Sequence, residues 1–256
     1  MRKYGFWLAI AFLIVGCASD DSNDVVDGPG NNGNANLRNT GDSAEELLRS
    51  DNFDQLEVEL IYVNGARPET TSINNLKSFL QARLNKPNGI NIVERNVTND
   101  AGDDYSIEEV SDLENSSRTS FSRDQTIAVS VLFVDKPNDG DEGNSVVLGS
   151  AYRNTSLVIY QSTIERFSRS VNQPSRVDLE STVYNHEFGH LLGLVNLGTP
   201  LQSQHEDAEN DRHCNVDGCL MFFQINGGNI LDMMNMTSIP QLDPQCIADL
   251  QANGGK

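Results

Sequence analysis

Apolar runs of strand length recur along the first two thirds of the chain. Leu56–Val63 alternates apolar and polar side chains before becoming continuously apolar, which predicts a strand. Ile90–Val97 predicts a second strand, and the nearly unbroken apolar run Thr126–Val134 predicts a central strand that is buried on both faces. Two shorter strands are expected at Val146–Tyr152 and Ser156–Ile159. Together these runs predict one mixed sheet.

Helical patterns lie between and after the predicted strands. Apolar residues recur at helical spacing from Ile73 to Leu84, and an acidic stretch from Ser106 to Arg118 predicts an exposed helix. A longer helix is expected from about Val177 through His190 to Gly193, since glycine tolerates the positive φ that often ends a helix. This order of elements predicts an α/β (α+β) fold.

The remainder of the chain has weaker patterns. Beyond Gly193 we expect irregular loops up to about Gln241 and a short helix after Pro244. The predicted folded domain spans residues 51–256, with an N-terminal subdomain at 51–193 and a C-terminal subdomain at 194–256.

The N-terminus has the pattern of an export signal. Two basic residues precede the apolar stretch Phe6–Val15, which is too short to span a membrane, and a glycine lies directly before Cys17. This junction resembles the bacterial lipobox, and the resemblance implies a signal peptide at residues 1–16 and lipidation of Cys17. An ordinary secretory signal is the alternative. Residues 17–50 are predicted to be a lipidated cysteine followed by a flexible, acidic tether.

The acidic residues after Cys17 resemble a surface-export signal of some Gram-negative lipoproteins. The expected location is therefore the bacterial outer membrane, exposed at the cell surface, with its periplasmic face as the alternative. The chain has 256 residues and a formal net charge of -19. Such a surface repels nucleic acid. We expect no nucleic-acid partner, membrane attachment through the lipid, and a monomer.

The most specific chemical motif is His186-Glu187-Phe188-Gly189-His190-Leu191-Leu192-Gly193. On a helix, His186 and His190 lie on one face and can bind one metal ion, with Glu187 near enough to act on a water molecule. A catalytic zinc ion usually takes three protein ligands and leaves one position for water. Two histidines therefore leave the ligand set incomplete.

This motif resembles the HExxHxxGxxH signature of the metzincin metallopeptidases. At the position of the third histidine the chain instead has Asn196, whose amide is a weak zinc ligand. Downstream, the run from His213 to Met221 reads HC-x4-C-x-M and is similar to the motif of archaemetzincin-like peptidases. The resemblance implies that His213 is the third ligand, after an insertion, and that Met221 is the Met-turn residue beneath the metal.

His205, inside that insertion, is the alternative third ligand, because all 4 histidines of the chain lie between His186 and His213. Cys214 and Cys219 could form a disulfide in an oxidising compartment, which would leave Cys246 unpaired; alternatively, the three cysteines are metal ligands or free thiols. The later CxxC of archaemetzincins is absent, so the second zinc of that family is not predicted.

The sequence therefore predicts a metzincin-like fold with an active-site helix, and a Zn²⁺-dependent endopeptidase that acts on peptide or protein substrates. The resemblance implies that zinc activates a water molecule and that Glu187 is the general base. It also implies that the strand near Ser145–Tyr152 pairs with an extended substrate. The alternative is a non-catalytic, zinc-stabilised surface lipoprotein that acts as a binding module.

Overall fold

The computed structural model describes residues 35–256, except residues 101, 144, 170–172, 223–235 and 237. The predicted signal peptide and the lipidation of Cys17 lie outside the described residues. Within the described residues, no helix has the length and apolar character needed to cross a membrane.

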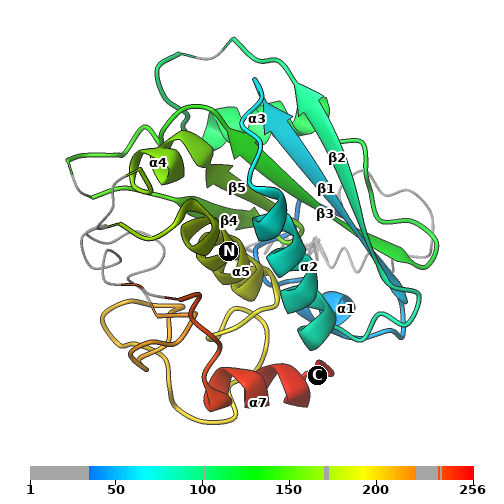
Figure 1. The fold of residues 1–256 in the computed structure, drawn as a ribbon. Coiled ribbons are helices and arrows are strands. Elements are labelled where there is room, and N and C mark those ends of the chain that lie inside the picture. Colours follow the sequence, from blue (N-terminus) through cyan, green and yellow to red (C-terminus); the bar gives the residue numbers. More distant parts are fainter. Residues whose placement is uncertain (1–34, 101, 144, 170–172, 223–235, 237) are drawn as a thin grey trace, which may run out of the picture.

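Five strands form one sheet in the order β2-β1-β3-β5-β4 (Figure 1). The strands are β1 (Gln55–Val63), β2 (Ile90–Val97), β3 (Thr126–Val134), β4 (Gly149–Arg153) and β5 (Ser156–Tyr160). All neighbouring pairs are parallel except β4 and β5, which are antiparallel. The predicted mixed sheet is confirmed, and the antiparallel strand lies at its edge.

Helices cover both faces of the sheet. They are α1 (Ala44–Leu48), α2 (Thr70–Arg83), α3 (Ile107–Ser117), α4 (Gln161–Arg166), α5 (Arg176–Leu191) and α7 (Pro244–Ala252). One face contributes Leu60 and Val131 to the main core, together with Leu76 of α2 and Val183 of α5. The opposite face forms a smaller core with Val110 of α3. In Figure 1, α2 and α5 lie side by side in front of the sheet.

The folded part of the chain begins earlier than predicted. Residues up to 50 were expected to be a tether, but Ala44–Leu48 forms α1, and Leu47 and Leu48 are fully buried in the main core. Thr40 also donates a hydrogen bond to the backbone oxygen of Ala151 in β4, at 3.0 Å. The prediction was wrong here because a five-residue helix is too short to show a periodic pattern.

The helix that carries the histidine motif has clear boundaries. The Ser175 hydroxyl accepts a hydrogen bond from the Asp178 amide at 3.1 Å and caps the N-terminus of α5. At the other end, Gly193 has a φ of 74°. A Cβ atom there would lie 2.6 Å from the Thr199 amide nitrogen and 2.7 Å from the Ala44 Cβ. The turn after α5 therefore requires glycine for two reasons, its conformation and its close packing.

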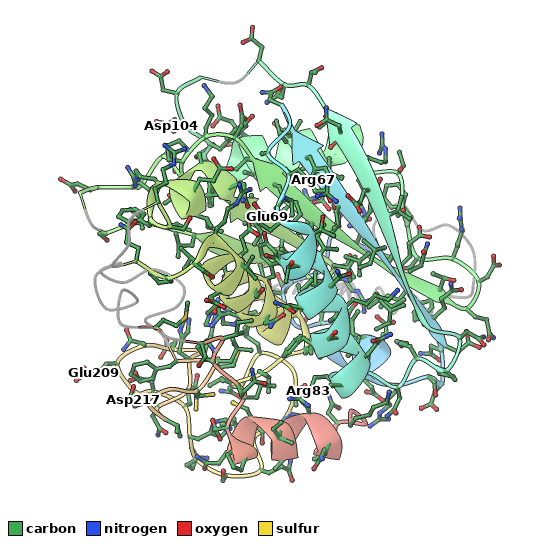
Figure 2. All side chains as sticks on the ribbon, in the orientation of Figure 1. Arg67, Glu69, Arg83, Asp104, Glu209 and Asp217 are labelled. Atoms are coloured by element: carbon green, nitrogen blue, oxygen red, sulfur yellow. The ribbon has the colours of Figure 1, made fainter. Side chains whose placement is uncertain are left out.

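The described residues between α5 and α7 form irregular loops, which short backbone hydrogen bonds hold together. The Cys214 amide donates to the Met221 oxygen at 2.7 Å, and the Asn215 amide donates to the His205 oxygen at 2.9 Å. Figure 2 shows Glu209 and Asp217 at the outer side of these loops, where both are exposed. The acidic side chains face solvent, whereas His205, Cys214 and Met221 are buried.

Candidate metal centre

Three histidines meet where α5 faces the C-terminal loops. His186, His190 and His213 each place one ring nitrogen within 4.8 Å of the other two. The Nε2 atoms of His186 and His190 are 3.1 Å apart, whereas two imidazole nitrogens on one tetrahedral zinc ion lie about 3.3 Å apart. The spacing of the helical pair fits one ion of this size.

Hydrogen bonds determine which ring nitrogen of His186 and of His213 carries the proton, and which keeps a lone pair that can bind a metal. His186 Nδ1 is 2.7 Å from the Leu220 carbonyl oxygen, and His213 Nδ1 is 2.9 Å from the Asp211 carbonyl oxygen. A carbonyl oxygen only accepts, so each Nδ1 carries the proton and each Nε2 keeps its lone pair. The buried Nε2 of His213 has no hydrogen-bond partner among the described residues. An unpaired, buried nitrogen beside two other imidazoles is suited to bind a metal ion.

Burial keeps the helical pair uncharged. Burial, and the neighbouring His213, lower the pKa of His186 to about 3. Burial and the two neighbouring imidazoles also place the pKa of His190 well below its ordinary value. Zinc binds the neutral form of imidazole, so the rings are in the ligating form at neutral pH.

The two candidates for the third ligand are separated in space. The structure brings His213 to the helical pair, while His205 belongs to a different cluster with Cys214, Asp243 and Cys246. Asn196, at the position of the missing third histidine, is exposed and donates to Glu206 at 3.2 Å. The chain therefore leaves α5 after Gly193 and returns to the helical pair at His213.

Glu187 is buried beside the edge strand. Its Oε2 atom accepts a hydrogen bond from the Ala151 amide of β4 at 2.9 Å. Burial raises the pKa of Glu187 to about 8, although this hydrogen bond acts in the opposite direction. Gly149 permits the close approach, because a Cβ atom on it would lie 3.0 Å from the Glu187 Cγ. A buried carboxyl with a raised pKa is suited to proton transfer near neutral pH.

Met221 packs against Gly189 of α5, a residue to which the sequence analysis gave no role. A Cβ atom on Gly189 would collide with the Met221 sulfur atom. The only signal in the sequence was a glycine inside a helix, which carries a cost and therefore often has a packing reason. Nothing in the sequence indicated the close packing of Gly149 against Glu187, because Gly149 lies within a segment that has the usual pattern of a strand.

A second cluster lies beside the first. His205, Cys214, Asp243 and Cys246 each place one ligand atom within 4.8 Å of the others. Cys214, Cys219 and Cys246 are free thiols, so the predicted disulfide between Cys214 and Cys219 is not present in the structure. The Sγ atoms of Cys219 and Cys246 are 3.8 Å apart. Hydrogen bonds from Cys214 and Cys246 lower the pKa of the Cys219 thiol.

No family model and no curated protein matches the sequence. Among solved structures, archaemetzincin from Methanopyrus kandleri is similar, with a TM-score of 0.52 and 16% identity over 78% of this chain and 96% of that chain. The chain has the archaemetzincin fold. Metalloproteinase-II from Bacteroides fragilis aligns with a TM-score of 0.42 and 15% identity, over 80% of this chain and 54% of that chain.

Proposed function

We propose that this protein is a zinc-dependent endopeptidase. His186, His190 and His213 would hold the ion, and Glu187 would be the catalytic proton carrier. The observation that carries the proposal is the convergence of three imidazoles beside a buried carboxyl, with the His213 Nε2 unpaired among the described residues. A fold similar to that of archaemetzincin supports it.

The residues of the site have distinct tasks in this proposal. Zinc, when bound, supplies Lewis acidity that activates water at neutral pH and polarises the scissile carbonyl. Glu187 takes the proton of the attacking water and delivers it to the leaving amine. The Ala151 amide, at 2.9 Å from Oε2, holds the carboxylate in one orientation during both transfers. The buried position of Glu187 strengthens these electrostatic interactions.

The substrate is proposed to bind along β4. This strand is at the edge of the sheet, pairs with β5 on one side only, and contacts α5. An extended peptide can add to such an edge through backbone hydrogen bonds. The Thr40 hydroxyl already donates a hydrogen bond to the Ala151 oxygen, so the segment before α1 covers one end of this edge. The peptide would pair with the part of β4 nearer Gly149.

The N-terminal sequence supports a further part of the proposal, attachment to the membrane. A lipidated Cys17 would anchor the domain at the bacterial outer membrane, and the acidic segment after it favours the outer surface. Cys17→Ser should abolish incorporation of labelled fatty acid. Incorporation that survives this substitution would contradict the anchor without affecting the peptidase proposal.

The decisive experiment is a Glu187→Gln substitution, assayed with a quenched fluorescent peptide library. The substitution removes the proton acceptor but none of the three imidazoles, so we expect activity to fall at least about 10²–10⁴-fold while zinc stays bound. Glu209→Gln is the control for the same chemical change, since Glu209 is an exposed acid in the loops that follow α5. Hydrolysis by Glu187→Gln at the wild-type rate would contradict the proposal. A wild-type protein that binds zinc but hydrolyses no peptide would also contradict it, and would favour a binding module.

A further inference from the structure

A long connection separates the helical pair from the third histidine of the candidate metal centre. α5 ends just before Gly193, and the chain passes through irregular loops before it reaches His213. The longer a flexible connection is, the less it restricts where its far end lies. The geometry of α5 places His186 and His190 on one face, but it does not place His213. Other contacts must therefore hold this ring beside the helical pair.

The first of these contacts lie within a hairpin, residues 206–214, which we call the histidine hairpin. Its two ends pair through an antiparallel bridge, and the Asp207 amide donates to the His213 oxygen at 2.8 Å. The Asp207 carboxylate accepts hydrogen bonds from the Glu209 amide at 2.9 Å and from Asn210 Nδ2 at 3.0 Å. The hairpin is thus a closed unit that holds the backbone of His213.

The backbone directly before His213 is in a conformation that needs support. Arg212 has a φ of 68°, in the left-handed region that residues other than glycine rarely adopt. Across this turn, His213 Nδ1 donates to the Asp211 oxygen at 2.9 Å, the bond that leaves Nε2 with its lone pair. Residues in such strained conformations persist only where the surrounding structure holds them. The orientation of the His213 ring therefore depends on what holds Arg212.

One carboxylate holds Arg212 and also bonds to the turn after α5. Glu206 Oε1 accepts a hydrogen bond from the Arg212 amide at 3.1 Å, and Glu206 Oε2 accepts one from Asn196 Nδ2 at 3.2 Å. Asn196 has a φ of 66° and lies a few residues after Gly193. Hydrogen bonds to a charged carboxylate are stronger than those between neutral groups. Glu206 thus links the end of the helix that carries two candidate ligands to the residue that precedes the third.

The other acids of the histidine hairpin do not make this link. Asp207 uses both oxygens within the hairpin. Glu209 and Asp211 are exposed, and their carboxylates have no hydrogen-bond or ion-pair partner among the described residues. In this part of the structure, Glu206 is therefore the acid whose side chain ties the hairpin to the rest of the molecule.

We propose that Glu206 is a positioning residue, which fixes the histidine hairpin to the turn after α5 and so places His213 Nε2 beside the helical pair. Asn196 is its anchor. This asparagine stands where the HExxHxxGxxH pattern has its last histidine, and it helps to hold the third ligand instead of being that ligand. Glu206 touches neither metal nor substrate in this role. The inference rests on the proposed function through the three-histidine site, and not through peptide hydrolysis.

The test changes the Glu206–Asn196 pair and measures the zinc affinity of the three-histidine site. Glu206→Ala removes both hydrogen bonds and should lower this affinity at least about tenfold. Asn196→Asp tolerates the left-handed backbone but sets two carboxylates against each other, and should lower the affinity similarly, although its added negative charge alone would favour zinc. The double variant Glu206→Gln/Asn196→Asp reverses donor and acceptor at the wild-type charge, and its affinity should lie within about threefold of the wild-type value.

The affinity is measured by competition with a chelator, and His186→Ala/His190→Ala shows how much zinc binds elsewhere in the chain. Glu209→Ala, which removes the same charge from the same hairpin, is the matched control and should leave the affinity unchanged. With excess zinc, Glu206→Ala should regain peptide hydrolysis, because no group that takes part in the reaction has been removed.

An unchanged affinity in Glu206→Ala would overturn the assignment, as would a double variant that binds zinc no better than Asn196→Asp. Hydrolysis that excess zinc does not restore would also overturn it, since Glu206 would then act in the reaction itself. Failure of the peptidase proposal would look different. A wild-type protein that shows these affinity changes but hydrolyses no peptide would contradict the peptidase and support the positioning role.

Discussion

The sheet region (residues 35–193) and the loop region (residues 194–256) bury polar groups in different ways. In the sheet region, the buried Glu114 carboxylate is satisfied by protein groups, since it accepts hydrogen bonds from Arg118, Arg153, Tyr152 and Ser156. In the described part of the loop region, thiols and imidazoles instead face one another at contact distance. The first arrangement offsets the cost of burying polar atoms, and the second brings together side chains that could hold a metal ion.

The apolar core explains why the two regions differ. The sheet is covered by helices on both faces, and its core contains most of the large buried side chains. The part of the loop region that the structure describes has α7 and isolated bridges, and its buried residues include three cysteines, Met221 and His205. A region with little regular structure can gain its stability from bound metal, as small zinc domains do.

Metal removal should therefore produce the largest difference between the two regions, in the rates at which their amides exchange hydrogen. After chelation, the amides of Asp207, Cys214 and Asn215, which bond within the loop region, should exchange at least about 10³-fold faster, because structural zinc contributes roughly 10–16 kcal/mol in small domains. Amides of β1 and β3 should change less than about tenfold. Hydrogen-exchange mass spectrometry measures both, with the zinc-reloaded protein as control. Equal acceleration in the two regions would contradict the comparison.

The second prediction concerns a substitution that destabilises the sheet region and changes no candidate metal ligand. Glu114→Gln leaves the buried Arg118 without its ion pair at 3.0 Å and the half-buried Arg153 without its pair at 2.8 Å. Breaking a buried pair by removing one partner typically costs about 3–5 kcal/mol in the free energy of unfolding. Urea unfolding of the zinc-loaded protein measures this loss.

The control for this prediction is Glu108→Gln, at an exposed position on the same helix, which should change the free energy of unfolding by less than about 0.5 kcal/mol. Metal content should stay at the wild-type value in both variants. A loss of metal in Glu114→Gln would mean that the loop region depends on the sheet region more closely than the contacts indicate.

The same contrast explains what the sequence could predict. β2 and β3 were predicted with their observed boundaries, and α5 to within one residue at its start and two at its end, because an apolar run or a helical motif is a local property of the chain. Short elements such as α1 and α4 carry too few residues for a periodic signal. Their burial depends on packing against residues that are distant in the sequence.

The site was predictable to a similar degree. His186, Glu187 and His190 share one helix turn, so their spacing alone places them together. The choice between His213 and His205 depends on how the insertion folds against α7, which no spacing encodes. The contact between His205 and Cys246 joins residues 41 positions apart, so it depends on how α7 packs beside the preceding loops.

The smallest expected effect is a pH-dependent contribution of one buried carboxyl, Glu59, to the stability of the sheet region. Burial alone would raise the pKa of Glu59, but hydrogen bonds from Thr119, Arg95 and Ser120 outweigh it and lower this pKa below its ordinary value of 4.5. A carboxyl with a lowered folded-state pKa stabilises the protein above its unfolded-state pKa, and this stabilisation is lost as pH falls through the folded-state value. Glu59→Gln should cost about 1–3 kcal/mol at pH 7.

That cost should shrink as pH falls below about 4.5, since the wild-type carboxyl becomes protonated while the amide does not titrate. Urea unfolding at a series of pH values, with metal content followed in parallel, measures the difference between the two proteins. The exposed Glu108→Gln should show no such convergence. A Glu59→Gln cost that stays constant from pH 7 to pH 3 would mean that the buried carboxylate contributes through its shape and not through its charge, and the contrast with the metal-dependent loop region would then rest on Glu114 and its partners.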